Sequence, residues 1–201
     1  MVEPDLELDV PSLEGTFVTK ALVMSPKDVE RALRRVAHEV VEKNKGTQDL
    51  IVLGLPSGGV RLAQELTEIL KEISQPAPLC GQLAIAPYRD DLHIRPIPVE
   101  EVTDVVSGLD GKSVLIVDDV ISTGRTVRAA LGALNDWGRP SLVQLAVLVD
   151  RGHRELPIKP DYVGKNLPTS RDEYVEVSDD GVRILARVSP GKPEHGTGRD
   201  R

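Results

Sequence analysis

The chain has 201 residues, 40% of them hydrophobic, and a formal net charge of −7. This size and composition suffice for one domain with a full buried core and no cross-links. The single cysteine, Cys80, excludes an intramolecular disulfide and argues against a zinc site. The first ten residues carry no basic residue and no apolar run, so we expect neither a signal peptide nor a membrane span, no membrane partner, and a cytoplasmic location.

The negative charge is concentrated at the N-terminus. Five acidic residues and no basic residue lie among the first fifteen, and they leave −2 for the remainder of the chain. We expect residues 1–15 to form a disordered acidic leader, residues 16–189 a single domain, and residues 190–201 a frayed tail. The overall sign disfavours a nucleic-acid partner, but the charge distribution after the leader leaves that partner open.

The domain begins with a predicted strand and a well-delimited helix. The apolar stretch 17–24 predicts a first strand at the edge of a sheet. The run from Ser25 to Asp28 supplies an N-cap, a first-turn proline and a capping-box acid. The helix should continue to about Asn44 and be closed by Gly46.

A second strand and helix follow, joined by a glycine loop. Residues 50–54 predict a short strand, and the helix after the loop 55–59 has apolar residues at helical spacing from Leu62 to Ile73. A further strand is expected near residues 80–86. The polar stretch 87–111 comes next, and a loop of this length in a compact domain is usually functional or disordered.

The strongest pattern lies past the middle of the chain. Residues 114–117 are wholly apolar, as expected of a central parallel strand buried on both faces, and Asp118 and Asp119 should emerge at its carboxyl end. The loop 122–126 follows. It leads into a helix whose apolar positions are Val127, Ala130, Leu131, Leu134 and Trp137.

Four more strands complete the predicted fold. They are expected over 142–149, near Tyr162, and over 174–177 and 182–188, with a polar loop at 150–160. The alternation of strands and helices predicts an α/β fold with a doubly wound, mostly parallel sheet. In such a fold, ligands bind at the carboxyl ends of the strands.

The central motif has the chemistry of a sugar-phosphate site. Hydroxyls of Ser122, Thr123 and Thr126, together with loop amides, could hold a phosphate. Asp118 and Asp119 could accept hydrogen bonds from ribose hydroxyls and help retain Mg²⁺. The motif resembles the phosphoribosyl-pyrophosphate (PRPP) signature of type I phosphoribosyltransferases, whose fold adds a hood and a flexible loop. The PRPP-binding set is then Val120, Ile121, Ser122, Thr123, Gly124, Arg125 and Thr126. Two alternatives stay open: a structural acidic pair, or the acidic pocket of a phospho-receiver domain.

Two further segments complete the predicted PRPP site. The loop Ser57-Gly58-Gly59 is a candidate for binding pyrophosphate through backbone amides, although it also fits an ordinary tight turn. Arg89 lies in the long polar stretch and is a candidate catalytic residue that covers the pyrophosphate when that loop closes. With Asp118 and Asp119, it makes up the predicted catalytic set.

Several segments resemble the PyrR family, which combines uracil phosphoribosyltransferase activity with attenuation of pyrimidine operons. They include Arg31–His38, Tyr88–Leu92, Gly138–Pro140, Gln144–Ile158 and Gly164–Ser170, and the similarity spans about residues 20–188. The resemblance implies a phosphoribosyltransferase domain with PRPP, uracil, UMP and UTP as ligands, Mg²⁺ as cofactor, and a homodimer or homotetramer. It implies a uracil-binding region at Asp150, Arg151, Gly152, His153, Pro157 and Ile158.

The family also binds the leader of pyrimidine-operon mRNA, and its RNA contacts can be matched to this sequence. On the first helix they fall on Arg34, Arg35, His38 and Lys43, and beyond it on Arg154, Lys159 and Lys165. Helical spacing puts Arg31, Arg34, Arg35 and His38 on one arc opposite the apolar face. An arc of this kind is also typical of an ordinary solvated face.

The sequence departs from the family pattern at two positions of the site. The family usually has Thr-Arg-Gly where this chain has Ser57-Gly58-Gly59, and Leu-Tyr where it has Ile121-Ser122. An arginine restored at position 58 is therefore expected to strengthen PRPP binding or raise turnover. Two other functions remain as alternatives: a nucleotide-sensing RNA-binding regulator with weak or lost catalysis, and a purine-salvage phosphoribosyltransferase without RNA binding.

Overall fold

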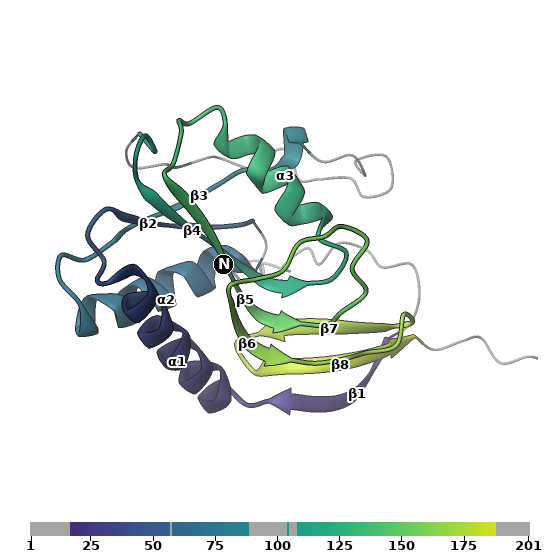
Figure 1. The fold of residues 1–201 in the computed structure, drawn as a ribbon. Helices are drawn as coiled ribbons and strands as arrows, with labels where there is room; N and C mark the ends of the chain where they lie inside the picture. Colours follow the sequence, from purple (N-terminus) through teal and green to yellow (C-terminus); the bar gives the residue numbers. More distant parts are fainter. Residues whose placement is uncertain (1–16, 57, 89–103, 105–107, 188–201) are drawn as a thin grey trace, which may run out of the picture.

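The computed structural model describes residues 17–56, 58–88, 104 and 108–187, which form two sheets and three helices (Figure 1). The larger sheet is parallel, with strand order β3-β2-β4-β5-β6, and the smaller is antiparallel, with order β1-β8-β7. The strands are β1 (Phe17–Met24), β2 (Leu50–Gly54), β3 (Leu79–Gln82), β4 (Ser113–Ile121), β5 (Leu142–Asp150), β6 (Tyr162–Asn166), β7 (Glu173–Ser178) and β8 (Gly181–Arg187). The helices are α1 (Pro26–Asn44), α2 (Gly59–Ile73) and α3 (Arg125–Leu134), with a short 3₁₀ helix, η1 (Ala86–Tyr88).

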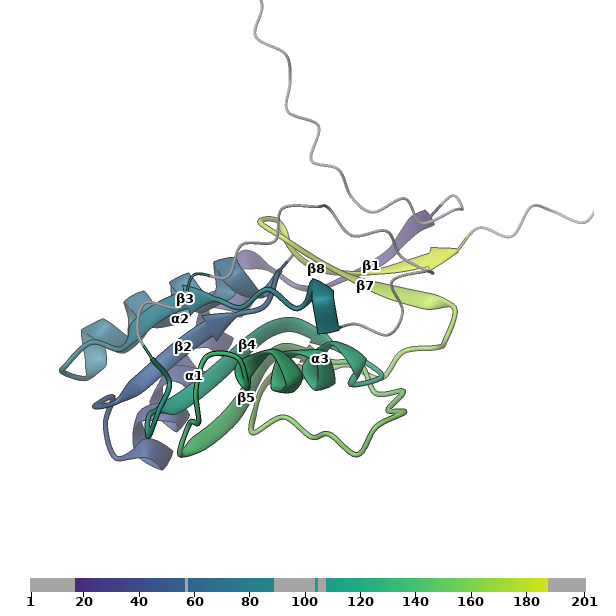
Figure 2. The same ribbon diagram turned by 90° about the horizontal axis from the view of Figure 1, so that it is seen from above.

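Helices cover both faces of the parallel sheet, as a doubly wound fold requires. Helices α1 and α2 share one core cluster with alternate residues of β2, β4 and β5, and α3 shares the other cluster with the residues between them. Both views show β1, β8 and β7 together as a small sheet to one side of the parallel sheet (Figures 1 and 2). This small sheet is the hood that the sequence led us to expect, and β1 is at its edge.

Helix α1 has the ends that the sequence predicted. The Ser25 hydroxyl accepts a hydrogen bond from the Asp28 amide at 3.3 Å, and the Asp28 carboxylate accepts one from the Ser25 amide at 2.9 Å. After Asn44 the chain turns through Lys45, whose φ is 56°, and the Gly46 amide donates to the Val41 carbonyl at 2.9 Å.

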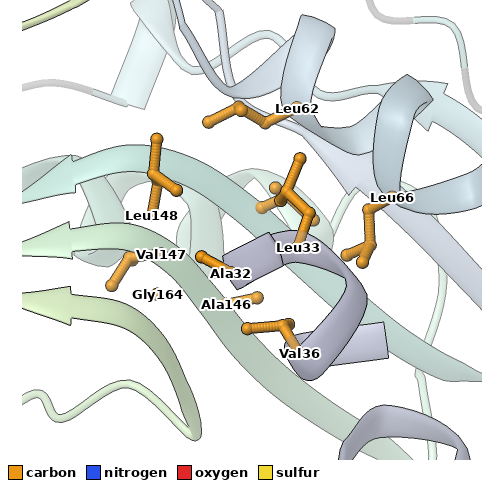
Figure 3. A pocket seen from close by; sticks show the side chains of 10 residues that line it. Ala32, Leu33, Val36, Leu62, Leu66, Ala146, Val147, Leu148 and Gly164 are labelled. Atoms are coloured by element: carbon orange, nitrogen blue, oxygen red, sulfur yellow. The ribbon is translucent and has the colours of Figure 1, made fainter. Parts of the chain in front are cut away.

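The apolar face of α1 meets α2 and β5 around a small, wholly apolar cavity, which is part of the core (Figure 3).

Three predicted element boundaries were wrong. Strand β4 does not end at Val117, because β5 continues to pair with it as far as Ile121, so Asp118 and Asp119 lie within the strand. Helix α3 ends at Leu134, and Leu131 and Trp137 are 42% and 40% exposed rather than buried. The strand expected near residues 80–86 ends at Gln82, and η1 follows.

Candidate active site

The last residues of β4 carry the two carboxylates. Strand β2 pairs with β4 only as far as Gly54 opposite Val117, so beyond that point β4 has β5 as its remaining sheet neighbour. Asp118 is buried, with 5% exposure, and its carboxylate accepts a hydrogen bond from the Asp119 amide at 3.0 Å. The Asp119 carboxylate accepts one from the Val120 amide at 2.7 Å. Both acids therefore lie at the carboxyl edge of the sheet, as predicted.

The carboxyl group of Asp119 is held in an environment that disfavours its charge. Burial raises its pKa above the ordinary value of 3.8, and hydrogen bonds with the Val120 amide and with Asp118 oppose that rise only in part. The positive charge of Arg61, in the first turn of α2, also lowers this pKa. A ligand that brings positive charge or hydroxyl donors to Asp119 would therefore relieve an unfavourable state.

The loop after β4, predicted to bind phosphate, turns sharply into helix α3. Gly124 is the N-cap of α3 and has a φ of 92°, in the left-handed region that glycine tolerates. A glycine cap brings no side chain to cover the amides of the first turn. The Thr123 hydroxyl accepts from the Arg125 amide at 3.3 Å, which orders the turn. Ser122, Thr123 and Thr126 are all partly exposed, so their hydroxyls can meet a ligand.

The second glycine loop packs directly against the end of β4. The Leu55 amide donates to the Val117 carbonyl at 2.9 Å, and a Cβ on Gly59 would come within 2.3 Å of that same carbonyl oxygen. A Cβ on Gly58 would come within 2.0 Å of Oδ2 of Asp119. The side chain of Asp119 thus fills the place of a side chain at position 58. Ser57 lies outside the described residues, and so does Arg89.

Sequence reasoning missed Arg61. It lies three residues after Gly58, and its guanidinium pairs with Glu65 at 2.6 Å and with Asp179 in the β7–β8 turn at 3.5 Å. In the sequence it is one of many charged helix residues, and only the fold brings it into electrostatic range of Asp119. It gives this edge of the sheet a positive charge close to the loop whose family arginine is absent.

The predicted uracil-binding loop lies against the PRPP loop. The amides of Glu155 and Leu156 both donate to the Thr123 carbonyl, at 3.0 and 3.1 Å, and the Arg151 amide donates to the Ile121 carbonyl at 3.1 Å. The Arg125 guanidinium contacts the Glu155 carboxylate at 2.8 Å. The two loops, far apart in the sequence, therefore form one continuous rim at the carboxyl edge of the sheet.

Several of the other residues predicted to bind uracil make contacts within this rim or with Thr169. The Asp150 carboxylate accepts from the Gly152 amide at 3.0 Å, and Arg151 donates to the Thr169 hydroxyl at 3.1 Å. His153, with a φ of 63°, has Nε2 at 2.8 Å from the Thr169 carbonyl. Ile158 lies against Gly124, 3.5 Å from where a Cβ there would be, and Pro157 is exposed.

The predicted basic surface lies on α1 and beside β6. Arg34, Arg35, His38 and Lys43 are exposed on the face of α1 opposite the core. Lys159, which precedes β6, and Lys165, on β6, are exposed as well. Arg35 reaches across to β6 and donates to the carbonyls of Val163 and Gly164 at 2.9 and 2.8 Å. Arg31, Arg35 and Lys165 line one open groove between α1, β1 and β6.

Acidic side chains neutralise part of this surface. Arg34 pairs with Glu72 of α2 at 2.9 Å, Arg35 with Glu39 at 2.5 Å, and Lys43 with Asp161 at 2.6 Å. These pairs are solvent-exposed, and exposed pairs contribute little stability, so a polyanion could displace the carboxylates at small cost. Arg154 differs from the other six predicted RNA contacts because its side chain is only 23% exposed.

The helices of the described residues are too short or too polar to span a membrane.

A family model described as a phosphoribosyl transferase domain matches residues 25–180. Among solved structures, a hypoxanthine phosphoribosyltransferase of Trypanosoma cruzi superposes with a TM-score of 0.65 at 20% identity, covering 85% of this chain and 98% of that one. A hypoxanthine-guanine phosphoribosyltransferase from Bacillus anthracis gives a TM-score of 0.65 at 15% identity, covering 85% and 100%. These likenesses show the type I phosphoribosyltransferase fold.

Curated relatives are much closer in sequence. A protein of Brevibacillus brevis named "Bifunctional protein PyrR" is 50% identical over 174 residues, covering 86% of this chain and 97% of the relative. A protein of the same name from Streptomyces coelicolor is 51% identical over 176 residues, covering 85% and 91%. About half of the residues are identical over nearly the whole length of these relatives, and the domain match covers the same part of this chain. The chain therefore belongs to the PyrR family of phosphoribosyltransferases.

Proposed function

We propose that this protein transfers ribose 5-phosphate from PRPP to uracil, forming UMP and pyrophosphate, and that it also binds the leader of a pyrimidine-operon mRNA in response to uridine nucleotides. It would act in the cytoplasm as a homodimer or homotetramer. The observation that carries the enzymatic part is the meeting of three loops at the carboxyl edge of one parallel sheet, around Asp118 and Asp119.

Three features of this edge each support one part of PRPP binding. The turn 122–126 is suited to the 5-phosphate, because it offers hydroxyls and the N-terminus of α3. Asp118 and Asp119 are suited to the ribose hydroxyls. The Gly58–Gly59 loop, at the N-terminus of α2, is suited to pyrophosphate. Such a site positions two substrates and stabilises a departing charge, so a protein nucleophile is not needed.

Magnesium fits the donor set of this site. Mg²⁺ is commonly held by one or two protein carboxylates together with substrate phosphates, and two successive carboxylates lie near the end of β4 here, with Gly58 beside Asp119. Asp118 and Asp119 would hold it jointly with PRPP. When bound, it would neutralise charge on the pyrophosphate as that group leaves.

The enzymatic proposal is tested by measuring UMP formation from uracil and PRPP in the presence of Mg²⁺, with guanine and hypoxanthine as competing substrates. We expect turnover with uracil and little with either purine. Turnover with a purine alone would instead identify a purine-salvage enzyme.

A second candidate function is a nucleotide-sensing regulator with weak catalysis. The glycine at position 58 favours it, because this loop lacks the arginine that the family usually has there and therefore offers no side-chain cation to pyrophosphate. This candidate predicts that UMP binds measurably by calorimetry while UMP formation from uracil stays near background.

The RNA-binding part rests on the exposed cations of α1 and on the groove that Arg31, Arg35 and Lys165 line. It is tested by filter binding of a pyrimidine-operon leader hairpin over a salt series. Replacing Arg35 with alanine should weaken binding and reduce the salt slope by about one unit for a lost phosphate contact. Lys71→Ala is the matched control, because Lys71 is an exposed cation on α2 that pairs with Glu68. Equal affinities for the two variants would contradict the proposal.

A further inference from the structure

Arg154 makes more intramolecular contacts through its side chain than an RNA-binding arginine needs. Its guanidinium donates to the Asp150 carboxylate at 2.6 Å, the Ser122 carbonyl at 2.8 Å and the Ile158 carbonyl at 2.9 Å, with a longer contact to the Gly152 carbonyl at 3.4 Å. These acceptors surround the planar group on several sides. The side chain is only 23% exposed, whereas those of Arg34 and Arg35 are 47% and 50% exposed.

The acceptors belong to both loops of the candidate site. Asp150 is the last residue of β5, and Gly152 and Ile158 belong to the loop that follows it, where we place uracil. Ser122 belongs to the turn after β4, where we place the 5-phosphate. We call residues 150–158 the nucleobase loop and residues 122–126 the phosphate loop. Arg154 is hydrogen-bonded to the beginning and the end of the nucleobase loop and also to the phosphate loop. Only a guanidinium has enough donors in a fixed planar fork to satisfy these acceptors together.

The contact with Ser122 has a direct consequence for the phosphate loop. The Ser122 carbonyl that accepts from Arg154 is fixed in direction, and the same planar peptide group carries the amide of Thr123. The orientation of that amide is therefore set in part from the nucleobase loop. Because reaction rates depend steeply on how two substrates are aligned, a link between their two binding loops bears on turnover.

We propose that Arg154 is a positioning residue of the transferase, whose guanidinium holds the nucleobase loop in register with the phosphate loop. This inference rests on the proposed function for the identity of the two ligands. It departs from the family match, which places Arg154 among the RNA contacts and implies that its loss leaves transfer intact. In the conformation described, the guanidinium is committed to Asp150 and Ser122.

The test compares Arg154→Ala, Arg154→Lys and Arg183→Ala. Arg183 is a matched control, because its side chain is 29% exposed, it pairs with Asp180 at 3.1 Å, and it lies on β8 of the small antiparallel sheet. The readouts are the affinity for PRPP with Mg²⁺ by calorimetry, kcat and KM for UMP formation, and the melting temperature. PRPP affinity does not depend on which base is used, so it tests the inference even if uracil is not the substrate.

We expect Arg154→Ala to lower kcat/KM by about 10- to 100-fold, with a weaker affinity for PRPP. Arg154→Lys should recover only part of the loss, because an ammonium can pair with Asp150 but lacks the fork that also reaches Ser122 and Ile158. Added guanidinium ion at millimolar concentration should partly restore Arg154→Ala, which a general loss of folding would not allow. Arg183→Ala should retain wild-type values.

If Arg154→Ala and Arg154→Lys both retained the PRPP affinity and kcat/KM of Arg183→Ala, the inference would be overturned. If Arg154→Ala is too unstable to assay, the kcat/KM and PRPP affinity of Arg154→Lys test the inference, because lysine preserves the positive charge opposite Asp150. A wild-type protein that binds PRPP but does not use uracil would refute the proposed function, and the PRPP affinities of the variants would still decide the role of Arg154.

Discussion

Asp119 combines two properties that oppose each other. We propose that its carboxylate binds ribose hydroxyls and Mg²⁺, yet burial raises its pKa, so ionisation costs the ligand-free protein free energy. Residues that bind charged ligands commonly carry such a cost when the ligand is absent. The neighbouring Gly58 adds a steric condition, since Asp119 can take this orientation only where position 58 has no side chain.

Asp119→Asn should abolish most transfer while stabilising the ligand-free protein. A carboxyl whose pKa is raised on folding destabilises the folded state as the pH rises above its ordinary value of 3.8. Removing the charge should therefore raise the melting temperature at pH 7, by about 2–4 °C for each kcal/mol gained. Turnover should fall by about 100-fold or more. Thermal unfolding across pH checks the first effect, and the gain should vanish below pH 3.8, where the wild-type carboxyl is also neutral.

Gly58→Ala should impair PRPP binding. The φ of Gly58 is −94°, so alanine is acceptable to the backbone, and the obstacle is the 2.0 Å approach of its Cβ to Asp119. The structure thus leads to the opposite of the expectation that an arginine at position 58 improves the enzyme. We expect the KM for PRPP to rise about tenfold in Gly58→Ala, and Gly58→Arg to be no better than wild type.

Gly108→Ala is the control for this substitution, because a Cβ at Gly108 would meet no atom within 4 Å. The KM for PRPP is measured by steady-state kinetics for Gly58→Ala, Gly58→Arg and Gly108→Ala. If Gly58→Ala matched Gly108→Ala in its KM for PRPP, the observed orientation of Asp119 would not be needed for binding.

The buried face of helix α1 can be predicted from the sequence, but the ion pairs on its outer face cannot. Its buried face and its ends follow from apolar spacing and from the Ser25–Asp28 capping box, which are local signals. Its outer face is neutralised in part by Glu72, which belongs to α2 and lies 38 residues away from Arg34 in the sequence. No local pattern gives that pairing, because it depends on how the two helices pack.

Glu72→Gln should strengthen binding of the leader hairpin. The variant leaves Arg34 without its 2.9 Å partner, so RNA no longer has to displace that carboxylate. An exposed pair is weak, so we expect an increase in affinity of about two- to fivefold. Glu68→Gln changes the net charge equally, but Glu68 pairs with Lys71 and serves as the control. Equal gains in both variants would mean that general charge, and not the Arg34 pair, controls affinity.

Long-range packing also explains where the sequence misled on α3 and β4. Helix α3 approaches the sheet through Ala129, Ala130 and Ala133, which rotates Leu131 out to solvent, and hydrophobicity alone does not distinguish small residues that allow close approach from large ones. Strand β4 extends through Asp118 because β5 supplies a partner there. The contact of Gly58 with Asp119 could not be predicted, since a missing side chain gives no chemical signal.

Across the whole molecule, the candidate active site and the basic surface are linked through the segment from β5 to β6. Its first part forms the nucleobase loop that Arg154 holds, and its last part supplies the β6 carbonyls that accept from Arg35 on α1. A change in the loop on nucleotide binding thus has a short structural route to the surface proposed for RNA. Such a route gives a bifunctional protein a means of coupling its ligands.

The proposed bifunctional role is tested by the affinity of the protein for a pyrimidine-operon leader hairpin, measured by filter binding with and without saturating UMP and beside an unrelated RNA of equal length. This role predicts that the hairpin binds more tightly than the unrelated RNA, and that UMP strengthens hairpin binding by about 5- to 150-fold, the usual range for coupled sites. Equal affinity for the two RNAs, unchanged by UMP, would contradict it.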